Sequence, residues 1–170
     1  MLSWLGLLGA CGAAPANPEG PSGELSASDE PVVFSFPGAG DSEVNSATTR
    51  GRVTLLVFVT TYDIASQIVL RRVADAIARF TPRANAAAVV LEPPVYVDLL
   101  PAYRESLSLP YPVVMADFAT QRGQGQFGGI QRVPTLVVLD REGREVSRRQ
   151  GSLTQQEIDE ALTRASRRSR

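Results

Sequence analysis

The stretch GRVTLLVFVTTYDIASQIVL, residues 51–70, decides the fold that we predict for the whole chain. Residues 53–59 are apolar or β-branched without interruption, which is typical of a central strand covered on both faces. The run ends at residues 60–62, and a helical pattern begins at Asp63. Because the first N–H groups of a helix have no intrahelical partner, such a junction attracts polar or negatively charged groups. We therefore predict a strand–helix junction at Asp63 and look there first for chemistry.

Strand and helix patterns continue on both sides of this junction. Strands are predicted at residues 31–36, 43–45, 86–91, 113–115, 135–139 and 144–150, and helices at 64–80, 100–107 and 154–165, with a weak helix in 118–127. Strand–helix–strand units with short connections require right-handed crossovers and parallel pairing, whereas the last two strands form an antiparallel hairpin. The sequence therefore predicts an α/β fold with a central mixed sheet and helices on both faces.

Composition excludes several classes of enzyme. The 170 residues, 44% of them hydrophobic, suffice for one domain with a core. The chain has no His, which excludes Ser-His-Asp and Cys-His catalysis and His-ligated zinc. Its single Cys, Cys11, excludes an intramolecular disulfide, a CxxC pair and a cysteine-cluster metal site. We expect no cofactor and no metal.

Every basic residue is Arg, which we attribute to genome composition rather than to a phosphate-binding surface, so no nucleic-acid partner is predicted.

The N-terminal region resembles a bacterial lipoprotein signal. Residues 1–10 are an apolar segment too short to span a bilayer, and residues 8–11 (LGAC) resemble a lipoprotein box in which a lipid is attached to Cys11. The basic residues that normally precede such a segment are missing, which leaves open a disordered N-terminus, an unmodified Cys11 and a cytoplasmic location. Residues 11–30 are predicted to be a flexible linker, 31–166 the domain and 167–170 a basic tail.

Residues 123–128 (GQGQFG) match the GxGxxG dinucleotide fingerprint in letters only. That fingerprint requires a helix that begins within the motif and meets a pyrophosphate with its N-terminus. Pro134 follows too soon for such a helix to form. We therefore predict a loop here and no dinucleotide site.

Four segments carry a family resemblance: FSFPGAGDSEV, GRVTLLVFVTTY, RVPTLVVLDREGREV and GSLTQQEIDEAL. Together they resemble the thioredoxin-like fold of the TlpA-like redoxins, which are envelope thiol-disulfide oxidoreductases related to peroxiredoxins. The resemblance implies a three-layer fold, a cis Val133–Pro134 bond beside the junction, and an envelope location, with the domain facing the periplasm or exterior.

The same resemblance places the two active-site cysteines of the family on Asp63 and Ser66. Neither residue can cycle electrons as a thiol pair does. The peroxidatic cysteine of related peroxidases also falls on Asp63, three residues after Thr60. Both catalytic positions are therefore degenerate, and the residues in them carry no redox chemistry.

Asp63 is predicted to be the N-cap of the helix, with its carboxylate accepting the N–H of Ala65 or Ser66. A peptide or protein of the cell envelope is the expected partner. The groove predicted to bind it is lined by Tyr62, Asp63, Ile64, Val133, Pro134 and Thr135. The expected function is that of a non-catalytic binding or scaffolding module of the cell envelope. Two alternatives remain open: a TlpA-type enzyme with some redox role that uses Cys11 as its reactive thiol, and a decayed paralogue whose domain only folds.

Overall fold

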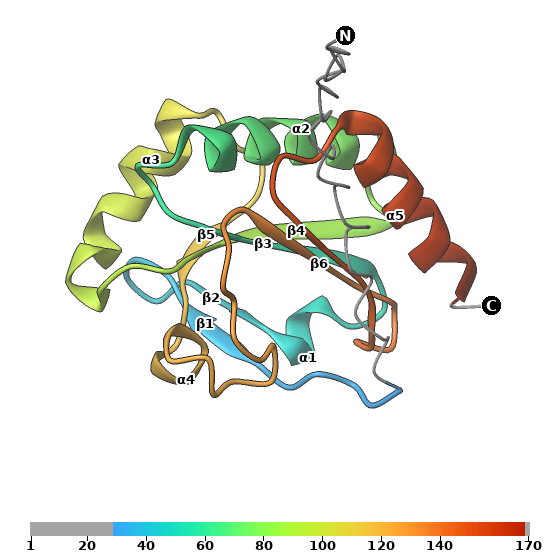
Figure 1. The fold of residues 1–170 in the computed structure, drawn as a ribbon, viewed down its shortest axis with the longest axis horizontal. Coiled ribbons are helices and arrows are strands. Elements are labelled where there is room, and N and C mark those ends of the chain that lie inside the picture. The colour runs from blue at the N-terminus through green and yellow to red at the C-terminus, as the bar shows by residue number, and fades with distance from the viewer. Residues whose placement is uncertain (1–28, 169–170) are drawn as a thin grey trace, which may run out of the picture.

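The computed structural model describes residues 29–168, and its elements are drawn in Figure 1. The sequence predictions for the signal segment, Cys11 and most of the linker lie outside the described residues. In chain order the elements are β1 Ser35–Pro37, β2 Glu43–Asn45, α1 Ser46–Thr49, β3 Val53–Val59, α2 Ile64–Phe80, β4 Ala84–Val90, the 3₁₀ helix η1 Pro94–Leu99, α3 Leu100–Ser106, β5 Val113–Met115, α4 Phe118–Gln121, β6 Thr135–Leu139, β7 Glu145–Gln150 and α5 Gln155–Arg168.

The central sheet has five strands in the order β5-β4-β3-β6-β7. β3, β4 and β5 are parallel to one another, while β6 runs antiparallel to β3 and β7 antiparallel to β6. The predicted mixed sheet is therefore confirmed. Because β3 lies in the middle, all seven of its residues are buried, as the uninterrupted apolar run indicated.

The two faces of β3 contribute to two separate cores. Leu55 and Val57 pack with the large core under α2, α3 and α5, which cover one face of the sheet in Figure 1. Leu56 and Phe58 point to the other face, where the two-stranded sheet β1-β2 and the short helices α1 and α4 lie. Period-2 alternation of the strand side chains thus produces three layers.

The second face is covered differently from the first. Its helices, α1 and α4, have only four residues each, and the face is filled mainly by aromatic side chains. Phe34, Phe36, Phe58 and Phe127 form a cluster with ring centroids 5.2 to 6.1 Å apart. Helices therefore lie on both faces, as predicted, but an aromatic cluster rather than long helices closes the second one.

Some predicted strand limits are wrong. Residues 31–34 are extended, with the expected alternation of buried and exposed side chains, yet only Ser35–Pro37 pairs with a strand. The N–H of Val32 donates to the carbonyl of Gly143, and that of Val33 to the Gln126 side chain. Alternation follows burial and not strand pairing, so it cannot locate the strand itself. β4 likewise begins at residue 84, two residues before the predicted start.

The C-terminal elements follow their local signals. The Thr154 N–H donates to the Glu157 carboxylate at 2.7 Å, and the Glu157 N–H donates back to the Thr154 hydroxyl at 3.3 Å, so the two residues form a capping box where the sequence predicts a helix to begin. Residues 123–128 form a loop after α4, so no helix begins in the glycine motif. Within residues 29–168 none of the helices has the length and apolar character needed to cross a bilayer.

Candidate functional site

The site begins where β3 ends and α2 starts. Asp63 is the N-cap of α2, with an extended backbone (φ −89°, ψ 120°). Its Oδ2 accepts the N–H of Ser66 at 2.7 Å and the Ser66 hydroxyl at 2.6 Å. Ser66 is fully buried, so the carboxylate closes the first turn of the helix from outside. The predicted cap is confirmed, and Ser66 makes both of these hydrogen bonds.

These hydrogen bonds determine the charge state of Asp63. The Ser66 hydroxyl, helped by the N–H groups of Ser66 and Ala65, lowers the pKa of Asp63 from its ordinary value, against a smaller opposing effect of burial. A carboxylate that accepts several hydrogen bonds at a helix N-terminus stays ionised at neutral pH. The junction therefore carries a fixed negative charge without a nucleophile or an available proton.

The loop after β3 is tied to the loop after β4. One oxygen of Glu92, Oε1, accepts both the N–H of Thr61 at 2.5 Å and the Thr61 hydroxyl at 2.7 Å. The Thr61 carbonyl accepts a hydrogen bond from the Gln67 side chain in α2 at 3.1 Å. These contacts hold the segment before Asp63 in one conformation, although it belongs to no helix or strand.

The Val133–Pro134 bond lies at the start of β6 and is cis. Thr135 pairs with Phe58 in the antiparallel β3–β6 ladder, so the preceding Pro134 comes level with the end of β3. Pro134 is buried, and Val133 is half-buried. Thr135 is fully buried, and its hydroxyl donates to the carbonyl of Arg132 at 2.6 Å. Of these three predicted groove residues, Val133 is the one with substantial exposed surface.

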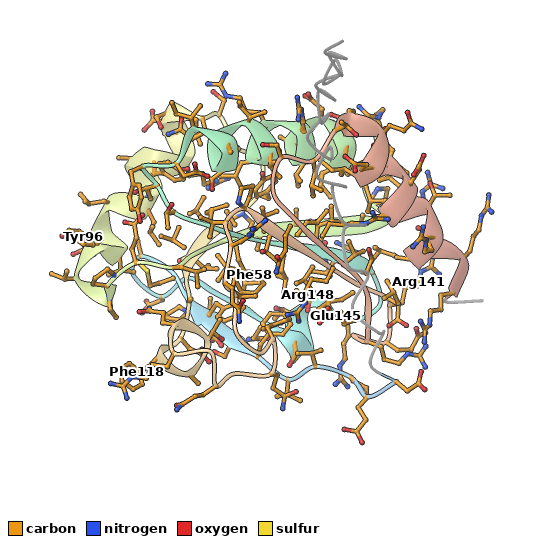
Figure 2. All side chains as sticks on the ribbon, in the orientation of Figure 1. Phe58, Tyr96, Phe118, Arg141, Glu145 and Arg148 are labelled. Carbon is orange, nitrogen blue, oxygen red and sulfur yellow. The ribbon has the colours of Figure 1, made fainter. Side chains whose placement is uncertain are left out.

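Large exposed hydrophobic side chains gather at one edge of the sheet. Within residues 29–168 these are Val33, Tyr62, Ile64, Ile68, Val95, Tyr96, Leu99 and Phe118. All except Val33 follow the carboxyl end of a parallel strand, where such ends meet at a common edge. Figure 2 shows Tyr96 and Phe118 on the same side of the molecule. Tyr62 and Ile64 are 79% and 72% exposed, so this apolar edge surrounds the Asp63 junction with accessible surface.

The part of this edge that η1 and α3 supply is not among the groove residues predicted from the sequence. Val95, Tyr96 and Leu99 come from η1, a segment for which the sequence predicts no helix or strand. Glu92 and Tyr103 lie beside them and were not considered. A signal was present, since this segment follows a parallel strand and must therefore emerge at the same edge as the junction. The apolar residues after residue 94 were nevertheless given no role in binding.

The arrangement limits the chemistry of the site. The only cysteine of the chain is Cys11, which lies outside the described residues, so none of the side chains that the structure places at the junction is a thiol. Residues 29–168 contain no group of three or more acidic or cysteine side chains placed to hold a metal ion. What the edge offers is apolar surface, two carboxylates and the exposed start of a helix. These features suit binding of another chain.

Comparison with solved structures identifies the fold. A thiol:disulfide interchange protein of the thioredoxin family from Chlorobium tepidum superposes with a TM-score of 0.66 at 18% identity, covering 79% of this chain and 94% of that chain. A DsbF homologue from Corynebacterium diphtheriae gives a TM-score of 0.69 at 16% identity, covering 87% and 96%. A secreted Mycobacterium tuberculosis disulfide oxidoreductase homologous to Escherichia coli DsbE gives 0.61 at 12% identity, covering 76% and 94%.

These similarities confirm the thioredoxin-like α/β fold that the sequence predicted, over most of the chain. No protein-family model matches the sequence, and no curated protein matches it significantly. At these identities the likeness establishes the fold alone. The similar structures are described as thiol-disulfide proteins, whereas a chain with one cysteine cannot form the intramolecular disulfide that such chemistry uses.

Proposed function

We propose that this chain is a non-catalytic thioredoxin-like binding module, whose apolar edge holds a peptide or protein of the cell envelope. One observation carries the proposal: the exposed side chains of Tyr62 and Ile64 flank Asp63, a helix-capping residue on which the resemblance places the first active-site cysteine of the family. Exposed apolar surface is costly to keep in a soluble domain, so its concentration beside one feature indicates binding. In this proposal the chain keeps the fold of a redox family and uses the position of the former active site to bind a partner.

The location of the module is part of the same proposal. A lipid on Cys11 would tether the domain to a membrane through residues 11–30, whose composition suits a flexible linker. The similar M. tuberculosis protein is described as secreted, which supports a location outside the cytoplasm. Mass spectrometry of the protein from membranes tests the anchor, since a diacylglycerol on Cys11 is expected. An unmodified, uncleaved N-terminus would contradict the tether and leave the binding edge to be tested separately.

Site-specific photocrosslinking tests the binding role. A photoreactive amino acid replaces Tyr62 or Ile64 in the full chain, expressed in the source organism. Val33 provides the matched control, because it is 62% exposed but precedes β1 and so does not follow the carboxyl end of a parallel strand. We expect both edge positions to capture the same product and the control position to lack it. If the products from all three positions are the same, or if none forms, the edge is not a binding surface.

A further inference from the structure

A pocket lies next to the Asp63 junction, between the loop after β3 and the η1–α3 segment. Its volume is about 390 Å³, within the range of pockets that hold small ligands or single side chains. It is lined by Thr61, Glu92, Tyr96, Leu99, Leu100 and Tyr103. The pocket is thus mainly aromatic and aliphatic, with a single carboxylate in its wall.

Only one of the two carboxylate oxygens of Glu92 accepts hydrogen bonds from the rest of the described domain. Both of its hydrogen bonds, to the Thr61 N–H and to the Thr61 hydroxyl, use Oε1. Among residues 29–168 no donor reaches Oε2, and no arginine forms an ion pair with Glu92. A carboxylate oriented in this way still has a free oxygen with two lone pairs.

The hydroxyl of Tyr103, another residue of the pocket wall, is also unpaired. It is buried and has no hydrogen-bond partner within the described part of the chain. Burial, and then the negative charges of Glu92 and Asp63, raise the pKa of Tyr103 to about 12. The phenol therefore stays protonated, in a field that both neighbouring charges make negative. A buried polar group without a partner calls for an explanation, and a bound ligand supplies one.

We propose that this pocket binds the cationic side chain, arginine or lysine, of a peptide that lies along the apolar edge. The inference rests on the proposed binding function and specifies the chemistry of the partner. The cation would donate to Oε2 of Glu92 and to the phenol oxygen of Tyr103, and it would lie against the Tyr96 ring. Neighbouring apolar residues of the peptide would cover exposed side chains such as Ile64 and Leu99.

The end of α5 does not supply this cation. Arg168, at the end of α5, donates to the carboxylate of Asp29 at 3.0 Å. In Figure 1 the end of α5 lies on the side of the molecule opposite to α3, which flanks the pocket. The cation therefore comes from a partner, and the partner is an apolar segment that carries a basic side chain.

Propylguanidinium chloride is a suitable probe, and N-propylurea is its neutral counterpart of similar shape. Each is titrated into the ¹⁵N-labelled full chain, and amide shifts of Thr61 and Tyr103 are followed. We expect saturable shifts with the guanidinium and none with the urea. Glu92→Gln should weaken binding about tenfold, because a charge-assisted hydrogen bond is lost while the amide oxygen still accepts from Thr61. Equal binding of both probes, or unchanged binding to Glu92→Gln, would overturn the proposal.

Two further variants test whether the pocket itself, rather than the overall charge of the domain, binds the cation. Glu105→Gln removes one negative charge from exposed α3 surface outside the pocket, and we expect unchanged binding. Tyr103→Phe keeps the ring and removes only the hydroxyl, and we expect weaker binding of propylguanidinium. If Glu105→Gln weakens binding as much as Glu92→Gln does, the effect is long-range and the pocket is not the site.

The two proposals can fail separately. If the crosslinked partner segment carries no arginine or lysine facing the pocket, the cation site is overturned and the binding edge stands. If propylguanidinium binds in a Glu92-dependent way while crosslinking from Tyr62 and Ile64 gives no specific product, the cation site stands and the binding function is overturned.

Discussion

Two tyrosines that pack on the same hydrophobic core differ in one hydrogen bond. Tyr111 is 3% exposed, and its hydroxyl donates to the Leu70 carbonyl at 2.5 Å. Burial, and to a lesser extent Tyr103, raise its pKa. Tyr103 has a raised pKa for a related reason, but its buried hydroxyl has no partner among the described residues. The same substitution at the two positions therefore isolates the value of that hydrogen bond.

We expect Tyr111→Phe to lower the free energy of unfolding by about 1 kcal/mol, because a buried hydrogen bond is lost. Tyr103→Phe should leave it within about 0.5 kcal/mol or raise it, because the removed hydroxyl is unsatisfied. Urea unfolding of the two variants and the natural chain measures both values. A destabilisation by Tyr103→Phe as large as that by Tyr111→Phe would mean that the Tyr103 hydroxyl has a partner.

Asp63 gives a prediction with a defined pH dependence. Asp63→Ala removes the N-cap and should cost about 1 kcal/mol at pH 7. Because the pKa of Asp63 is lowered in the folded state, the stabilisation from its charge is complete above the ordinary value of 3.8 and is lost as the pH falls through the folded-state pKa.

Asp63→Asn isolates the charge, because its amide oxygen can still accept the Ser66 N–H. The natural chain should be more stable than Asp63→Asn at neutral pH, and the difference should shrink as the pH falls below about 4. Chemical unfolding from pH 7 to pH 2.5 checks the sign. A difference that grows on acidification would show that the folded state raises the pKa instead.

At the scale of elements, the sequence predicts those helix starts and strands that depend only on residues a few positions apart. The β3 run, the Asp63 cap and the Thr154–Glu157 capping box depend on neighbours within a few positions, and the structure contains all three. The limits of β1 could not be obtained in this way, because they depend on which distant groups accept and donate hydrogen bonds. Sequence patterns report burial directly and pairing only indirectly.

The β6–β7 hairpin contains a β-bulge that the local sequence pattern does not predict. Its register shifts between Val138 and Leu139, so Glu145 lies opposite Leu139 and Arg148 opposite Val137. Residues three apart on a regular strand point to opposite faces, but this bulge turns both side chains to the aromatic face. Figure 2 shows them beside each other below the sheet.

Glu145 and Arg148 form a buried ion pair, with Arg148 Nε 2.7 Å from Glu145 Oε1 and both side chains 10% exposed. Arg148 Nη1 also donates to the carbonyl of Phe127 at 2.5 Å. The pair therefore connects the bulged strand to the loop that supplies the aromatic cluster. Removal of either partner leaves a buried charge without compensation.

We expect Glu145→Leu to lower the free energy of unfolding by about 3 kcal/mol, because Arg148 then stays buried and unpaired. The double variant Glu145→Leu with Arg148→Met should lose less than the single variant, because no charge remains to be desolvated. Guanidinium unfolding of the natural chain and these variants measures both. If the double variant is less stable than Glu145→Leu, the unpaired charge of Arg148 is not what destabilises the single variant.

For the whole molecule, the layers were predictable and the binding edge was only partly so. The uninterrupted apolar run of β3 and the strand–helix order predict a sheet with helices on both faces, the resemblance implies three layers, and the structure has them. Tyr62 and Ile64 flank the Asp63 cap, and both are exposed. Tyr96 and Leu99 were missed because their exposure depends on how η1 and α3 pack at the end of β4, which is a tertiary property. The pocket beside Glu92 was missed for the same reason.

The last prediction tests that edge through its exposed side chains. Tyr96 and Leu99 are 46% and 61% exposed, so a large part of each side chain is open to a partner, while the rest packs on the domain. The double variant Tyr96→Ser with Leu99→Ser should stay folded and lower the free energy of unfolding by about 1 kcal/mol per site. It should nevertheless abolish the crosslinked product formed from Ile64, because the partner loses apolar contacts. Val33→Ser is the control that should leave the product unchanged. Persistence of the product in the double variant would restrict the binding surface to the start of α2.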